Sequence, residues 1–134
     1  MKMSISDLTS YEQAIVNSWV DTHKKSTLVL FILLSLSAAP SWSGQLRVFI
    51  DELSDGHLRV DEQSLHRALR RLDSLNVITH TTEDAPGTGL KRKIYTLTQT
   101  GERILNAYLA TTLSYARKPR FQELIEVHGS GGAK

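Results

Sequence analysis

An amphipathic segment from Asp61 to Asn76, with the sequence DEQSLHRALRRLDSLN, constrains the fold more than any other part of the chain. Its apolar residues recur at intervals of three and four, so a helix here has one stripe to bury and an opposite side that faces solvent. Asp61 is expected to cap this helix, and Glu62 lies in the first turn, where it interacts favourably with the helix dipole. The stripe consists of Leu65, Ala68, Leu69, Leu72 and Leu75.

The opposite side of this predicted helix carries polar and cationic groups and no acid. It consists of Gln63, Arg67, Arg70 and Ser74, flanked by Ser64, His66 and Arg71. Arginine and amide side chains at this spacing can make bidentate contacts with guanine or adenine edges and can hold phosphate oxygens. Exposed arginines are also ordinary on a solvated helix, so the helix is interpreted as a DNA recognition helix only together with the segment that follows it.

After Asn76 the hydrophobic period changes from helical to alternating. Val77 to Thr82 is rich in β-branched residues and predicts a strand, residues 83–89 predict a turn, and Leu90 to Leu97 predicts a second strand. The returning strand begins with three cations, and Tyr95 and Leu97 share a face that should be buried. A basic β-hairpin beside a recognition helix is typical of the wing of a winged helix. The wing cations are Lys91, Arg92 and Lys93.

Three helices are expected before the recognition helix. The first, from Leu8 to Val20, has a capping box of Thr9 and Glu12, and it either packs on a second subunit or covers its own domain. The second, from Ser26 to Ser37, is apolar almost all round and ends before Pro40. The third follows the turn 41–44, whose serines can cap it, and ends at Asp55-Gly56. Residues 57–60 could form a short edge strand.

The chain after the hairpin predicts a helix capped by Thr98 that continues to Tyr115, and a short helix around Phe121 to Val127. The broad apolar surface of the longer helix predicts a partner, for which a homodimer is the simplest choice. The expected fold is mainly α with a small β-hairpin, a winged helix-turn-helix with extra N- and C-terminal helices for dimerisation. The expected parts are an N-terminal helix in 1–22, the winged helix in 23–98, dimerisation helices in 99–128 and a flexible tail in 129–134.

Composition narrows the class of protein. A chain of 134 residues can bury a core as one domain, and the absence of cysteine excludes thiol catalysis and disulfides. Residues 57–134 carry a net charge of +4 and residues 1–56 a net charge of −2, so the basic excess lies with the predicted recognition helix. The apolar run after Lys24-Lys25 resembles a signal peptide, but it is shorter than the roughly 20 residues of a membrane span. We expect a buried helix there, no membrane association and a cytoplasmic protein.

Other functional classes find little support in the sequence. The histidines do not follow a metal-binding spacing, and the acidic groups do not follow that of a calcium loop. No nucleophile elbow and no phosphate-binding glycine loop is present, so neither an enzyme, a metal site nor a cofactor is expected. A winged helix that binds another protein through the same surface stays open as the alternative. The histidines are His23, His57, His66, His80 and His128.

The run from Ser64 to Ile78, followed by Lys91-Arg-Lys-Ile-Tyr-Thr-Leu-Thr-Gln-Thr-Gly101, resembles the PadR family of winged-helix transcriptional regulators. Its wing-closing pattern Tyr-x-Leu-Thr-x-x-Gly is matched by Tyr95, Leu97, Thr98 and Gly101. A glycine commonly stands in that family where this chain has Asn76, and asparagine tolerates a left-handed backbone. The resemblance implies a homodimeric transcriptional repressor that binds double-stranded DNA. In many cases a small molecule governs the release of such a repressor from its DNA.

These considerations assign a role to each candidate site residue. Gln63, Ser64, Arg67 and His66 would reach base edges, whereas Arg70 and Arg71 would hold phosphates. The wing cations would engage the backbone or the minor groove, and Ser43 is a further candidate for a DNA contact. A two-fold dimer requires a pseudo-palindromic site. Trp19 and Trp42 could stack on a small aromatic effector, although packing is the commoner role of tryptophan.

Overall fold

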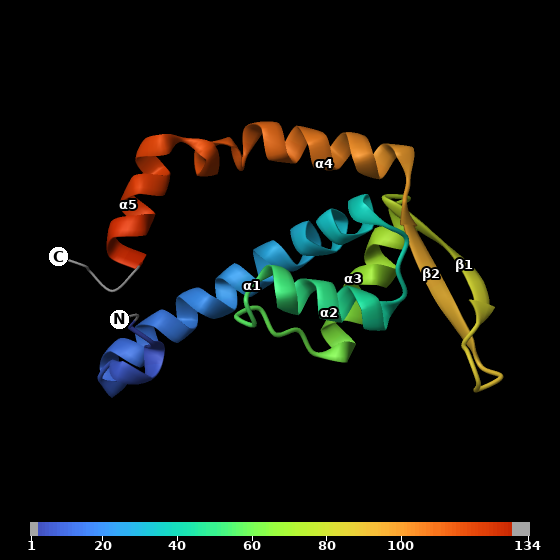
Figure 1. Cartoon of the computed structure of the whole chain (residues 1–134), viewed down its shortest axis with the longest axis horizontal. Coiled ribbons are helices and arrows are strands. Elements are labelled where there is room, and N and C mark those ends of the chain that lie inside the picture. Colours follow the sequence, from blue (N-terminus) through green and yellow to red (C-terminus); the bar gives the residue numbers. More distant parts are fainter. Residues whose placement is uncertain (1–2, 130–134) are drawn as a thin grey trace. The chain divides into compact units, whose positions relative to one another are not determined.

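The computed structural model describes residues 3–129, and Figure 1 shows the order of the elements along the chain. They are mainly helical with one antiparallel hairpin, as the sequence predicted. The described residues from Lys24 to Asn106 form one compact unit, and those before Lys24 and after Asn106 form a second. The elements are α1 (Ser10–Ala38), α2 (Ser43–Leu53), α3 (Glu62–Ser74), β1 (Ile78–Asp84), β2 (Lys91–Leu97), α4 (Gln99–Thr111) and α5 (Pro119–Gly129), with short 3-10 turns at Ile5–Asp7 and Ser114–Arg117.

Helix α1 corrects the prediction of two separate N-terminal helices. The predicted capping box is present, since the Thr9 amide donates to Glu12 Oε1 at 2.9 Å and the Glu12 amide donates to Thr9 Oγ1 at 3.2 Å. From there the helix runs without a break to Ala38. Residues 21–25 are polar but contain neither glycine nor proline, so nothing in the backbone ends the helix between the two apolar stripes.

The core of the 24–106 unit combines one side of each element. Each large apolar side chain buried there contributes about 1.5–3 kcal/mol to the stability of the fold relative to an exposed position. The predicted stripe of α3 supplies three of its members, and most of the rest come from the C-terminal half of α1, from α2 and from the hairpin. The buried apolar residues are Ile32, Leu33, Leu36, Leu46, Ile50, Leu58, Leu65, Leu69, Leu72, Val77, Ile78, Tyr95 and Leu105.

The two ends of α3 are fixed by local hydrogen bonds. Asp61 is the N-cap, as predicted, and its carboxylate accepts from the Ser64 amide at 2.7 Å. At the other end Asn76 has a φ of 62°, and the Val77 amide donates to the Leu72 carbonyl at 3.0 Å. This is a Schellman ending, and it turns the chain directly into β1.

Strand β1 pairs with β2 in a register that places Ile78 opposite Leu97 and Asp84 opposite Lys91. The predicted edge strand at residues 57–60 is wrong. The hairpin is extended instead by Ser41, which exchanges two backbone hydrogen bonds with Tyr95 at 2.8 and 3.0 Å. Pro40 cannot continue a helix, so the chain leaves α1 in an extended conformation that brings Ser41 alongside β2.

The start of α4 is joined to the end of α3 at Val77. The Thr98 amide donates to the Val77 carbonyl at 3.1 Å, and Thr98 Oγ1 accepts from the Gly101 amide at 2.9 Å. Thr98 therefore caps the helix, as predicted. A Cβ atom on Gly101 would lie 2.1 Å from the Val77 carbonyl oxygen, so this position has room only for hydrogen. The Thr-x-x-Gly pattern of the sequence thus encodes a cap and a close backbone approach.

The C-terminal helices differ in one respect from the prediction. Helix α4 ends at Thr111 rather than continuing to Tyr115. The Thr111 hydroxyl donates to the Ala107 carbonyl at 2.8 Å, and the Ser114 hydroxyl donates to the Thr111 carbonyl at 2.9 Å. These side chains compete for the backbone acceptors that a continuing helix needs. The short helix predicted beyond Lys118 is present as α5.

Two further points concern the ends of the chain and the apolar run. Of the predicted tail, residues 130–134 lie outside the described residues, and Gly129 is the last residue of α5. The apolar run after Lys25 forms the C-terminal half of α1, in which Ile32, Leu33 and Leu36 are buried. No helix within residues 3–129 is long and apolar enough to cross a membrane.

Replacement of Gly101 by alanine tests the close approach at Val77. We expect Gly101→Ala to lower the free energy of unfolding by about 1–3 kcal/mol, because the added methyl group must displace backbone rather than a flexible side chain. Urea denaturation followed by circular dichroism measures the change. Asn106→Ala, at an exposed position of the same helix, is the control and should leave stability nearly unchanged. Equal stability of the two variants would contradict this account.

Candidate nucleic-acid interface

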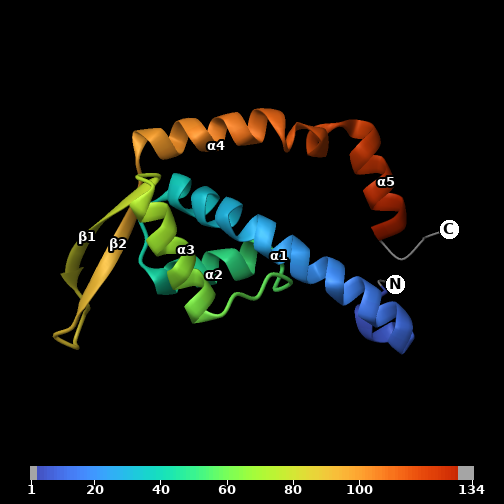
Figure 2. The same cartoon turned by 180° about the vertical axis from the view of Figure 1, so that it is seen from behind.

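The outward side of α3 is fully available to a ligand in the 24–106 unit. Gln63, Arg67, Arg70 and Ser74 are all exposed, while Leu65, Leu69 and Leu72 of the opposite stripe are buried. Leu75, also predicted to belong to the stripe, is exposed. Figures 1 and 2 show the hairpin extending away from α1, α2 and α3. The sequence placed the same four residues on one side of the helix, and the structure has them there.

The N-terminus of α3 holds a carboxylate in its charged form. Hydrogen bonds from the Ser64 amide and hydroxyl lower the pKa of Asp61, and the nearby Arg67 guanidinium lowers it further to a smaller extent. Because this pKa is lowered in the folded state, the cap is fully stabilising above the ordinary aspartate pKa and weakens only as the pH falls through the lowered value. Near neutral pH the first turn of α3 is therefore firmly capped.

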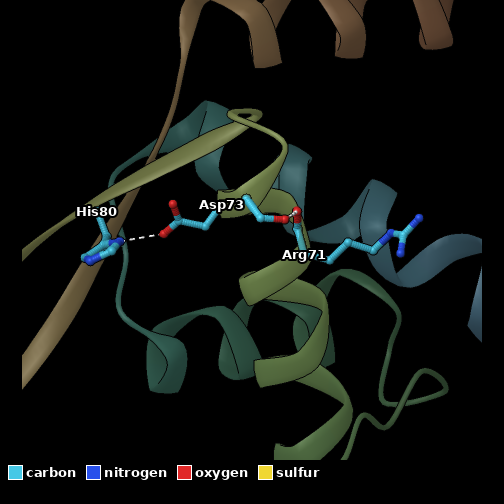
Figure 3. Close-up of polar contacts among 4 residues, drawn as sticks. Arg71, Asp73 and His80 are labelled. Atoms are coloured by element: carbon cyan, nitrogen blue, oxygen red, sulfur yellow. Dashed lines mark hydrogen bonds and ion pairs between the residues drawn. The ribbon is translucent and has the colours of Figure 1, made fainter.

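The side of α3 that faces the wing carries Asp73. Its carboxylate lies 2.5 Å from Nδ1 of His80 on β1, and Figure 3 shows the two side chains directed toward one another. The His80 ring in turn lies 5.8 Å from the Tyr95 ring, centroid to centroid. Burial, and to a smaller extent the charge of Asp73, raises the pKa of the Tyr95 phenol, which stays neutral. These contacts fix the base of the hairpin to α3.

The remaining candidates on α3 do not share one surface. Arg71 points away from Asp73 and His80 in Figure 3, and it lies with Ser64 on the side of the helix that borders α1. His66 is half-buried on the other side, 3.9 Å from Glu62. The predicted set therefore divides into an outward group around Arg67 and Arg70, of which Arg67 also borders α1, and two flanks.

The three wing cations have different surroundings. Lys91 Nζ lies 2.6 Å from a carboxylate oxygen of Asp84, the residue opposite it in the register, and both side chains are exposed. The Arg92 guanidinium lies over the Trp42 ring at 4.6 Å from its centroid. Lys93 is exposed and forms no ion pair with any described residue. Asp84 was not among the site residues predicted from the sequence, which placed it in the turn 83–89, whereas β1 extends to Asp84.

Trp42 is held between Arg92 and the backbone of α2. A Cβ atom on Gly44 would lie 2.3 Å from the Trp42 ring, so the ring packs directly on this glycine. Arg92 Nε is buried without a hydrogen-bond partner among the described residues, which is consistent with a guanidinium that stacks on the ring. The sequence suggests contacts with the DNA backbone or the minor groove for Arg92, and packing or effector stacking for Trp42. It gives no sign that the two side chains meet.

The other residues predicted to contact an effector or DNA lie in different parts of the chain. Trp19 belongs to the second unit and is 67 % exposed. Trp42 also lines a cavity of about 520 Å³ between the end of α1 and α2. Ser43 is half-buried as the first residue of α2. Among residues 3–129 no group of three or more histidine and acidic side chains is placed to hold a metal ion.

Helices α2 and α3 joined by a short loop, with a hairpin following the second helix, define a winged helix-turn-helix protein. The sequence profile described as "Transcriptional regulator PadR-like family" matches residues 32–107, which is more than half of the chain. The protein therefore belongs to the PadR-like family of transcriptional regulators. A search among curated proteins gave no match.

Solved structures agree with this assignment. A PadR family transcriptional regulator from Eggerthella lenta is 25 % identical with a TM-score of 0.64, over 81 % of this chain and 91 % of that one. Bacillus subtilis PadR in complex with operator DNA is 25 % identical with a TM-score of 0.57, over 62 % of this chain and 47 % of that one. A regulator from Clostridium thermocellum, at 17 % identity and a TM-score of 0.60 over 69 % and 86 % of the chains, shares the fold.

Replacement of Arg92 tests its contact with Trp42. We expect Arg92→Ala to lower the free energy of unfolding by about 0.5–2 kcal/mol, because a partly desolvated cation over an indole ring is lost. Lys93→Ala, which removes the same charge from the next position of β2, should change stability by less than about 0.5 kcal/mol. Thermal unfolding followed by tryptophan fluorescence measures both variants. If the two variants are equally stable, Arg92 does not hold the wing through Trp42.

Proposed function

We propose that this protein is a cytoplasmic homodimeric repressor that binds a pseudo-palindromic site in double-stranded DNA. The observation that carries the proposal is the exposed, acid-free side of α3 beside a wing whose base is fixed to the same helix. Membership of a family of transcriptional regulators supports it, and so does the likeness to the B. subtilis protein, whose structure contains operator DNA.

In this proposal α3 lies in the major groove. Gln63, Ser64, Arg67 and His66 contact base edges, and Arg67 is the principal reader because it is exposed near the capped end of the helix. Arg70 and Arg71 bind phosphates, and Ser43 at the start of α2 adds a contact to the DNA backbone. The phosphate contacts position the helix, and the base contacts read the sequence.

The three wing cations contribute unequally to the proposed DNA interface. Lys93 binds the DNA backbone, and Lys91 does so after exchanging Asp84 for a phosphate. Arg92 also belongs to the proposed interface, but its stacking on Trp42 favours a role in orienting the wing. Because exposed ion pairs contribute little, the loss of the Asp84 contact costs no more than about 1 kcal/mol.

Dimerisation is assigned to the parts outside the winged helix, namely the N-terminal arm in 1–22 and the helices in 99–128. The support is a set of large apolar side chains that these segments expose, which a monomer would leave in water. A small aromatic effector bound near Trp42 or Trp19 would control release from DNA. The exposed apolar residues are Tyr11, Trp19, Ile104, Tyr108, Tyr115, Phe121, Leu124, Ile125 and Val127.

A selection from random duplex DNA, followed by binding measurements on the selected site, tests DNA recognition. Arg67→Ala should cost about 1–3 kcal/mol and relax sequence preference, whereas Lys91→Ala should weaken all sequences alike and reduce the salt slope by about 1. The control is Arg103→Ala, an exposed cation of α4 outside the proposed interface. Absence of duplex binding even at low salt would favour the protein-interaction alternative.

Sedimentation equilibrium tests the dimer. We expect Ile125→Asp or Trp19→Asp to shift the protein toward monomer by at least about tenfold in dissociation constant, because a desolvated carboxylate would be placed in an apolar interface. Val48→Asp, an equally exposed apolar position on α2, is the control and should leave the dimer intact. A wild-type protein that sediments as a monomer at micromolar concentration would exclude the two-fold arrangement.

A further inference from the structure

A groove of about 610 Å³ lies between α1 and α3, entirely within the 24–106 unit. Its volume falls within the range of about 300–1,000 Å³ that is usual for small-molecule sites. The floor is apolar, and two of its members are notably exposed, Val29 at 38 % and Leu75 at 58 %. The floor residues are Leu28, Val29, Ala68, Leu72 and Leu75.

The rim of this α1–α3 groove is strongly cationic. Five basic side chains line it, and none of the five forms an ion pair with a carboxylate of the described residues. The one acid in the lining is Asp61, whose carboxylate accepts two hydrogen bonds from Ser64. The field in the groove is therefore positive. The basic residues are Lys24, Lys25, Arg59, Arg67 and Arg71.

We propose that the α1–α3 groove binds a small molecule with an apolar body and one anionic head group. The body would cover the exposed floor around Val29 and Leu75, which removes apolar surface from water. The head group would be held by Arg71, whose guanidinium forms charge-assisted hydrogen bonds with a carboxylate. Such a ligand fits because the groove offers both an apolar floor and unpaired cations.

Binding in the groove would also act on DNA recognition. Arg67 and Arg71 line the groove and belong to the proposed DNA interface, so an anion bound here neutralises charge that a phosphate would otherwise use. This consequence rests on the proposed function, whereas the binding of the anion does not. The groove is distinct from the Trp42 cavity, with which it shares no lining residue.

Isothermal titration calorimetry of the DNA-free protein with decanoate, below the concentration at which it forms micelles, tests the site. The wild type should bind decanoate at least about tenfold more tightly than decyltrimethylammonium, which has the same tail and the opposite charge. Arg71→Gln should weaken decanoate binding about tenfold or more. Arg70→Gln is the matched control, because it removes the same charge from the neighbouring position of α3 but does not line the groove.

Val29→Asp provides a second variant, since it places an acid on the exposed floor and should also abolish decanoate binding. Thermal unfolding verifies that each variant is folded.

Equal binding of the two amphiphiles, or equal loss of decanoate binding in Arg71→Gln and Arg70→Gln, would overturn the proposal. If decanoate binds in an Arg71-dependent manner but duplex DNA does not bind at all, the groove stands and the proposed function fails. If duplex DNA binds in a salt-dependent manner but decanoate does not bind, the proposed function stands and the groove fails.

Discussion

The burial of one leucine stripe on α3 determines the orientation of every α3 side chain on the proposed interface. Leu65, Leu69 and Leu72 are at most 6 % exposed, and their removal from water fixes the rotation of the helix about its axis. A rotation of about 100°, one residue's turn of the helix, would expose this stripe and cost several kcal/mol, since each such side chain contributes about 1.5–3 kcal/mol. The direction of Arg67 and Arg70 is therefore set by the burial of leucines on the opposite side of the helix.

The features that the sequence predicted are those encoded within a few residues. The caps at Thr9, Asp61 and Thr98 were inferred from polar side chains placed ahead of apolar runs, and their hydrogen bonds are present. The left-handed backbone of Asn76 agrees with the family resemblance, in which a glycine commonly stands at this position. The recognition helix and the hairpin follow from a change of hydrophobic period, which is also local.

The features that the sequence did not predict depend on contacts between distant residues. Ser41 pairs with Tyr95, Arg92 stacks on Trp42, and Asp73 meets His80, and no periodicity records any of these pairs. The continuity of α1 was missed for a different reason. Residues 21–25 are polar, which suggests a helix end, but they contain neither glycine nor proline and the helix continues through them. The end of α4 at Thr111 is accompanied by hydrogen bonds from the Thr111 and Ser114 hydroxyls to backbone carbonyls.

Thr98 and Gly101 contact the Val77 backbone closely, which fixes the start of α4 to the segment between α3 and β1. The carbonyl of Val77 accepts from the Thr98 amide, and the hydrogen-only side of Gly101 presses on the same oxygen, so the first turn of α4 cannot pivot there freely. Val77 lies in the short segment between α3 and β1, so α4 is attached directly to the chain that connects these two elements. The first turn of α4 and the residues between α3 and β1 are therefore expected to keep a fixed relative position.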